Sequence, residues 1–168
     1  DQPLIKGGAT IFVVTRRYDY AEFGKMVEQR ALPRGSNGHW RYNGRDAYGV
    51  ILCGKDDTFG KDVLLAEQVA GLALASRGVP KWFAHGGGLS IAGRMDHRDA
   101  RILELRAEAK EAVRNGVPAE KFLENDLSPE QSRLIGFAFV ERLMASKKSW
   151  KHLMNAISRN EEFESAFS

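Results

Sequence analysis

The spacing of hydrophobic residues predicts strands in the first part of the chain. Residues 10–15 (Thr-Ile-Phe-Val-Val-Thr) form a short β-branched apolar run, which predicts a buried strand. Helix-forming residues with apolar positions at Phe23, Met26 and Val27 follow over 19–30. Within residues 39–53, Asn43-Gly44 separates two strand-like runs, which is a strong β-hairpin signal. We therefore expect strand, helix, strand, hairpin and strand in this order.

The rest of the chain has helical patterns. Residues 61–78 carry apolar side chains around nearly the whole helix circumference, which predicts a buried helix that ends at Gly78. Residues 97–115 predict a charged amphipathic helix. Residues 128–131 (Ser-Pro-Glu-Gln) combine an N-cap serine, a proline at the first helical position and a capping-box glutamine, so a helix should begin there. The apolar residues of 150–167 predict a last helix or pair of helices.

This order of elements predicts a single α+β domain over residues 1–168. A small mixed sheet with its helices should occupy about 1–78, and an all-helical part about 79–168. Because the chain begins at Asp1 and not at a methionine, we expect it to come from a longer protein.

Composition narrows the classes of function. Hydrophobic residues make up 43% of the 168 residues and charged residues 28%, which is typical of soluble globular domains. The net charge of +3 is small and the basic residues are scattered, so nucleic-acid binding is not expected. No apolar run approaches the roughly 18 residues of a membrane span, so membrane insertion is not expected. The single cysteine, Cys53, ends an apolar run and should be a buried thiol.

Residues 85–88, His-Gly-Gly-Gly, match the string with which lipases and esterases build an oxyanion hole. Such a hole serves a nucleophile in a Gly-x-Ser-x-Gly turn on another loop. The nearest candidate, residues 88–92 (Gly-Leu-Ser-Ile-Ala), lacks the final glycine and overlaps the glycine run itself. We therefore reject the lipase interpretation.

Residues 80–94 resemble a segment of a different enzyme family. They contain Pro-Lys-Trp-Phe-Ala-His-Gly-Gly-Gly followed by Ala-Gly-Arg at 92–94. This pattern resembles the Pro-x-Trp-Leu-x-Glu-Gly-x-Ala-x-Tyr string of peptidase-MA-like zinc metallopeptidases of the gluzincin type, in which the glutamate is the third zinc ligand. His85 stands at the position of that glutamate. Residues 66–70, Ala-Glu-Gln-Val-Ala, resemble the His-Glu-x-x-His motif of the family with both histidines replaced by alanine.

The resemblance implies a zincin-like fold that has lost its chemistry. Ala66 and Ala70 cannot coordinate a cation, and His85 alone does not make a zinc site, which normally needs three protein ligands. Without a metal, Glu67 has no bound water of lowered pKa to deprotonate. We therefore expect no metal, no cofactor and no catalytic residue, with Glu67 and His85 as vestiges of the site. Family habit also implies an extracytoplasmic location.

Several roles remain open for the residues around this site. Glu67 would reach solvent or a backbone amide, pair with His85 and favour a protonated histidine, or form a catalytic dyad with it. Trp82 would be a core anchor or a binding platform. Gly86, Gly87 and Gly88 would allow close packing, or the close approach of a ligand. His39, His97 and His152 lack metal-ligand spacing and should be surface or packing residues.

The strand around residues 47–52 adds a binding hypothesis. In zincins the strand before the metal helix is a sheet edge that holds peptides by strand addition. An edge of this kind would place Tyr48 and Val50 in a cleft with Trp82 and the glycines, unless another part of the parent protein covers it.

The expected function is therefore that of a catalytically inactive metallopeptidase-like domain. Its role would be scaffolding, assembly, or ligand or peptide binding, with other domains of the parent protein or a protein or peptide as partner. The alternative is a hydrolase that uses Glu67 and His85 with an atypical metal or none.

Overall fold

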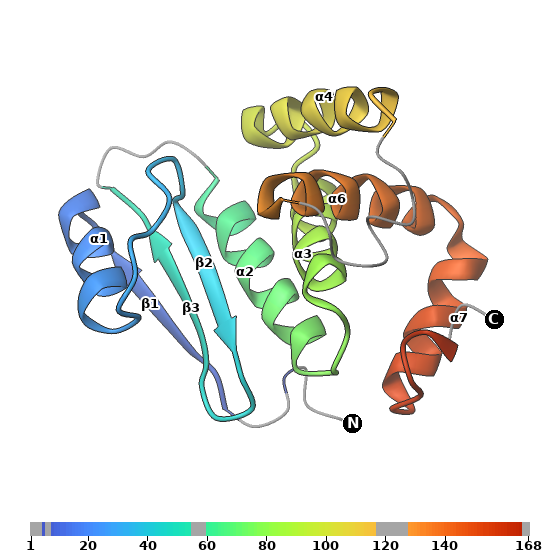
Figure 1. The fold of residues 1–168 in the computed structure, drawn as a ribbon, viewed down its shortest axis with the longest axis horizontal. Coiled ribbons are helices and arrows are strands. Elements are labelled where there is room, and N and C mark those ends of the chain that lie inside the picture. Colours follow the sequence, from blue (N-terminus) through green and yellow to red (C-terminus); the bar gives the residue numbers. More distant parts are fainter. Residues whose placement is uncertain (1–4, 6–7, 55–59, 117–127, 166–168) are drawn as a thin grey trace.

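The computed structural model describes residues 5, 8–54, 60–116 and 128–165, and Figure 1 shows their arrangement. The elements follow in the order β1 (Thr10–Val14), α1 (Arg17–Met26), β2 (Gly38–Tyr42), β3 (Ala47–Leu52), α2 (Lys61–Ala75), α3 (Lys81–Met95), α4 (Ala100–Arg114), α6 (Pro129–Ala145) and α7 (Lys147–Ser158). The strands lie in the first half and the second half is helical, so the α+β class is confirmed.

The three strands form a mixed sheet in the order β1-β3-β2. The central strand β3 is parallel to β1 and antiparallel to β2. The predicted hairpin is present: Tyr42 pairs with Ala47, and the Asn43 side chain accepts hydrogen bonds from the backbone N–H groups of Arg45 and Asp46. Its arms are β2 and β3, so the further strands predicted beside it are not found in the described part of the chain.

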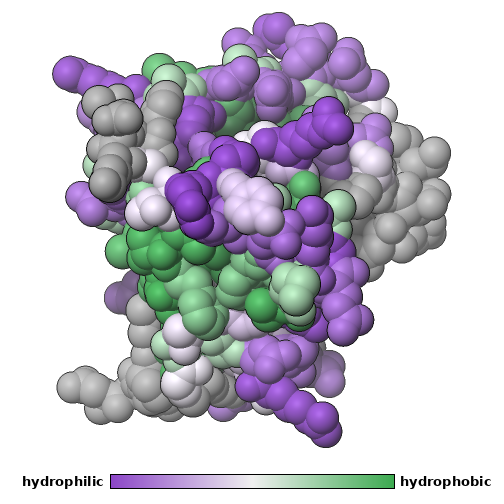
Figure 2. All heavy atoms as spheres, turned by 90° about the vertical axis from the view of Figure 1, so that its left-hand side faces the viewer, coloured by the Kyte–Doolittle hydropathy of each residue, from purple (hydrophilic) through white to green (hydrophobic). Residues whose placement is uncertain are grey.

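Strand β1 forms as predicted, but the expectation that it is buried is wrong. Phe12 is 41% exposed and Val13 is 60% exposed, because β1 is an edge strand. Helix α2 packs over β2 and β3, so the Val13 side of β1 lies beyond its cover. Figure 2 shows hydrophobic residues gathered on the face of the molecule that carries α1 and β1.

The helices form successive layers beyond the sheet (Figure 1). Helix α1 packs on one face of the sheet and α2 on the other, and α3 lies between α2 and α6. The predicted helix signals hold. Gly78, just after α2, has a φ of +79°, and Ser128 and Gln131 make the reciprocal hydrogen bonds of a capping box at the start of α6.

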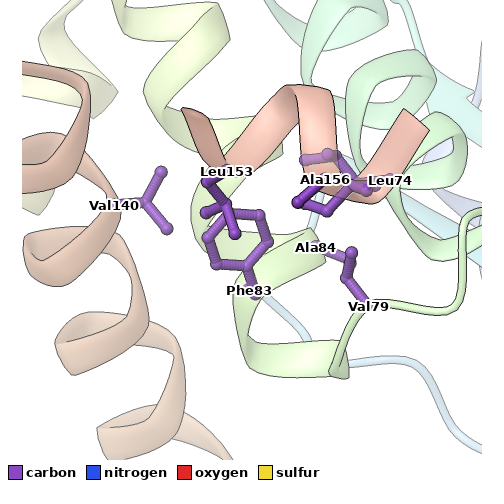
Figure 3. Close-up of a cluster of buried hydrophobic side chains, with 8 residues drawn as sticks. Leu74, Val79, Phe83, Ala84, Val140, Leu153 and Ala156 are labelled. Carbon is purple, nitrogen blue, oxygen red and sulfur yellow. The ribbon is translucent and has the colours of Figure 1, made fainter. Parts of the chain in front are cut away.

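The largest buried cluster joins α2, α3, α6 and α7 (Figure 3). Its buried members are Leu74, Val79, Phe83, Ala84, Val140, Leu153, Ala156 and Ile157. Phe83 at its centre has no exposed surface. Burial of each such large side chain contributes about 1.5–3 kcal/mol, so this cluster fixes α3 against the neighbouring helices.

Candidate functional site

The structure brings the two segments of the family resemblance side by side. Ala66, Glu67 and Ala70 lie on α2, and His85 lies on α3. The helices touch at Gly88, where an added Cβ would lie 2.6 Å from the backbone oxygen of Glu67. The candidate site is therefore the α2–α3 junction.

The glycine run positions α3 by allowing close helix packing on two sides. Gly88 meets α2, and Gly87 faces Leu74, also on α2. Gly86 meets α6, where an added Cβ would lie only 2.5 Å from the carbonyl oxygen of Gly136. All three glycines are buried, so neighbouring helices cover the surfaces that a cleft would need. Of the two interpretations of the run, this geometry favours close packing.

Trp40 is a member of the site that the sequence pattern does not single out. It lies on β2, and its indole covers Gly71 of α2, where an added Cβ would lie 2.3 Å from Nε1. The same ring lies against the imidazole of His85, with ring centres 4.5 Å apart and planes tilted by 31°. Trp40 thus touches both helices of the junction. The signal that could have found it is the alternation along the hairpin strand, which directs Trp40 to the face opposite His39.

Of the possibilities open for Glu67, the pair with His85 is not formed. No hydrogen bond or ion pair is found between these two side chains in the described part of the chain: the Glu67 carboxylate interacts with the side chain of Gln68, and the His85 ring lies against Trp40. Burial raises the pKa of Glu67, against the opposing effect of Arg101 and Arg133. A carboxylate–imidazole ion pair would lower the pKa of the acid, so the direction also argues against pairing.

The side chain of His85 is exposed to solvent, yet many protein atoms lie around its imidazole. This desolvation, with the positive charges of Lys81 and Arg133, lowers the pKa of the imidazole from 6.5 to about 4. His85 is therefore neutral at pH 7, whereas the pairing hypothesis favoured a protonated ring. Arg133 acts on both Glu67 and His85, and it is a second residue that the sequence pattern does not indicate.

Trp82, Tyr48 and Val50 do not gather at this junction. Trp82 packs against the cluster of Figure 3, with its ring 5.6 Å from Phe83 and 5.6 Å from Phe139. Tyr48 and Val50 belong to the cluster under α1, on the other face of the sheet, and Val50 has no exposed surface. The expected cleft with these residues as neighbours is therefore not what the fold builds.

The edge hypothesis for residues 47–52 also needs correction. β3 is the central strand and is paired on both sides, so it offers no edge for strand addition. The edge strand nearest α2 is β2, because the chain turns back through the hairpin to place β3 inside.

A polar network lies on the α1 side of the sheet. The Glu28 carboxylate has no exposed side-chain surface and accepts hydrogen bonds from Tyr48 (2.6 Å) and Arg30 (2.6 Å). Its Oε1 is also 3.0 Å from Nε2 of His39, whose Nδ1 is 2.8 Å from the hydroxyl of Tyr20. His39 is thus part of a buried network, a more specific role than ordinary packing.

Comparisons with protein-family models, curated proteins and solved structures give no match. Among the described residues, no group of three or more His, Cys, Asp or Glu side chains is placed to hold a metal ion. No helix in the described part of the chain is long and apolar enough to cross a membrane.

Proposed function

We propose that this chain is a zincin-like domain without metal chemistry that binds a peptide or protein segment beside β2. The resemblance implies a zinc ion at the junction of α2 and α3. The proposal rests mainly on the aromatic side chain that lies at this junction. The indole of Trp40 covers Gly71, which follows Ala70, and its ring centre lies 4.5 Å from that of His85. An apolar ring between the two helices supports a binding or scaffolding role over hydrolysis.

The edge of β2 supplies the polar groups that an extended segment would need. Asn37 bonds through its carbonyl to the N–H of Leu52, and antiparallel pairing alternates. His39 and Arg41 therefore bond to β3, whereas the backbone groups of Trp40 and Tyr42 point away from it. Strand addition uses such outward-facing groups, and Trp40 would offer an aromatic contact beside them.

Hydrolysis is tested first. We expect incubation with casein and with a quenched fluorescent peptide library, with or without added Zn²⁺, to give no turnover above that of a Glu67→Gln, His85→Ala double variant. Turnover that this double variant abolishes would establish the hydrolase alternative.

Binding at the edge is tested with an array of random extended octapeptides. Tyr42→Pro removes an outward N–H and leaves the hydrogen bonds between β2 and β3 intact. It should lower the affinity for captured peptides by about tenfold, as expected for the loss of a main-chain hydrogen bond and of the strand register. Arg41→Ala is the matched control, because the backbone of Arg41 bonds to β3, and it should keep binding. An array without captured peptides, or binding that Tyr42→Pro leaves unchanged, contradicts the proposal.

A further inference from the structure

A groove of about 320 Å³ lies between α4 and α6 and contains no residue of the α2–α3 junction. Its apolar lining consists of Ala109 and Val113 from α4 and of Phe137 and Ala138 from α6. Phe137 is only 1% exposed and forms the floor, whereas Val113 is 54% exposed at the rim. We call this hollow the α4–α6 groove.

A row of cations follows the groove along α4. Arg106, Lys110 and Arg114 all line it, at intervals of four residues. Arg106 donates two hydrogen bonds of 3.1 Å to Glu141 of α6, so the charges of these two side chains neutralise each other. Lys110 and Arg114 are exposed, and neither forms an ion pair with another residue in the described ranges. The groove therefore combines an apolar floor with two uncompensated positive charges on one rim.

We propose that the α4–α6 groove docks an acidic amphipathic helix of a partner protein. Residues four apart on a helix are separated by about 6 Å along its axis, so Lys110 and Arg114 match two carboxylates at i and i+4 on a second helix. Ala109 and Val113 repeat at the same interval and would receive the apolar row of that helix. A small carboxylate ligand would use only one of the two cations. An anionic membrane would leave the recessed Phe137 floor uncovered.

The test uses a capped, fluorescein-labelled helical peptide of 18 residues with glutamates in one i, i+4 row and leucines in the adjacent row. A peptide with lysine in place of each glutamate is the control ligand. We expect the acidic peptide to bind the whole chain in fluorescence anisotropy at low salt and to shift NMR amide signals of residues 106–114 and 137–141. Lys110→Glu with Arg114→Glu should weaken it by about tenfold or more, since two ion pairs become repulsions.

Two protein controls separate this site from general attraction. Lys147→Glu with Lys148→Glu makes the same change of charge on exposed lysines of α7 and should leave affinity within about twofold at moderate salt. Val113→Ser, at an exposed rim position, should weaken binding and keep the circular dichroism spectrum unchanged. The proposal is overturned if the acidic peptide does not bind, if the lysine peptide binds equally, or if both charge reversals weaken binding alike. Preferential binding to phosphatidylglycerol vesicles would overturn it in favour of a membrane surface.

Discussion

At the residue scale, the buried carboxylate of Glu28 organises the α1 side of the sheet. Burial opposes its ionisation, but the hydrogen bond from Tyr48 together with His39 and Arg30 outweighs this and lowers the pKa of Glu28. Burial also lowers the pKa of His39, against the effect of Glu28. One neutral tautomer of His39 then satisfies both neighbours, with Nε2–H donating to Glu28 and Nδ1 accepting from the hydroxyl of Tyr20.

Glu28→Ala should destabilise the protein by about 3 kcal/mol, because it leaves His39, Tyr48 and Arg30 without their shared acceptor. Urea denaturation followed by circular dichroism measures the change. Glu22→Ala is the control: Glu22 pairs with the exposed Lys25, and its loss should cost at most about 0.5 kcal/mol. Equal costs for the two variants would show that the network contributes nothing beyond a surface pair.

His85 should make the protein sensitive to acid. The unfolded chain protonates this histidine near pH 6.5, whereas the folded chain does so only near pH 4, so the stability of the fold falls as the pH drops through this window. In His85→Gln the decline between these pH values should be shallower, and His39 acts equally in both proteins. Urea melts at several pH values give the slopes, and NMR titration gives the pKa of His85. A pKa of 6.5 would contradict the desolvated environment, and only a pKa clearly above 6.5 would restore the pairing with Glu67.

At the element scale, the glycines of α3 let this helix pack closely against the backbones of α2 and α6. Three consecutive glycines lower the intrinsic stability of a helix, by roughly 0.5–1 kcal/mol each relative to alanine. Their position against the backbones of α2 and α6 explains why they are used, since helix axes can approach closely only where no Cβ intervenes. Packing therefore outweighs helix propensity in this element.

Gly86→Ala should destabilise the protein by about 2 kcal/mol or more, although alanine is the better helix former. The reason is that the new methyl group would lie 2.5 Å from a backbone oxygen of α6, which cannot move away as a flexible side chain would. Gly35→Ala is the control, because an added Cβ there meets nothing within 4 Å, and stability should change by less than about 0.5 kcal/mol. Calorimetry of thermal unfolding compares the stability of the two variants. If Gly86→Ala leaves stability unchanged, α3 and α6 are not in close contact.

Local signals predicted the helices better than the sheet. The end of α2 shortly before Gly78 and the start of α6 after Ser128 depend on residues within about one turn, so the sequence specifies them. The burial of β1 and the place of β3 depend on which strands pair, which is decided by contacts between distant residues. An apolar run such as residues 10–15 is compatible with a central strand and with an edge strand, and in this fold it forms an edge strand.

At the scale of the whole molecule, the candidate site is formed where the sheet meets the helical half. Ala66, Glu67, Ala70 and His85 could be placed near one another from sequence through the family resemblance. Trp40 and Arg133 could not, because they come from β2 and α6 and reach the junction only through the tertiary fold. The junction therefore contains an aromatic ring and fixed positive charges, neither of which appears in the sequence motif.

We propose that the α2–α3 junction is a zinc site that has lost its metal ligands through substitution. The direct test measures zinc content by mass spectrometry after dialysis. It compares the native chain with a restored variant that carries Ala66→His, Ala70→His and His85→Glu, and each of these is prepared both with Trp40 and with Trp40→Ala. We expect no stoichiometric zinc in the native chain and about one zinc per folded chain in the restored variant with Trp40→Ala, since three ligands would then converge and the indole would be gone. The proposal is wrong if the native chain holds stoichiometric zinc, or if the restored variant with Trp40→Ala folds and binds none.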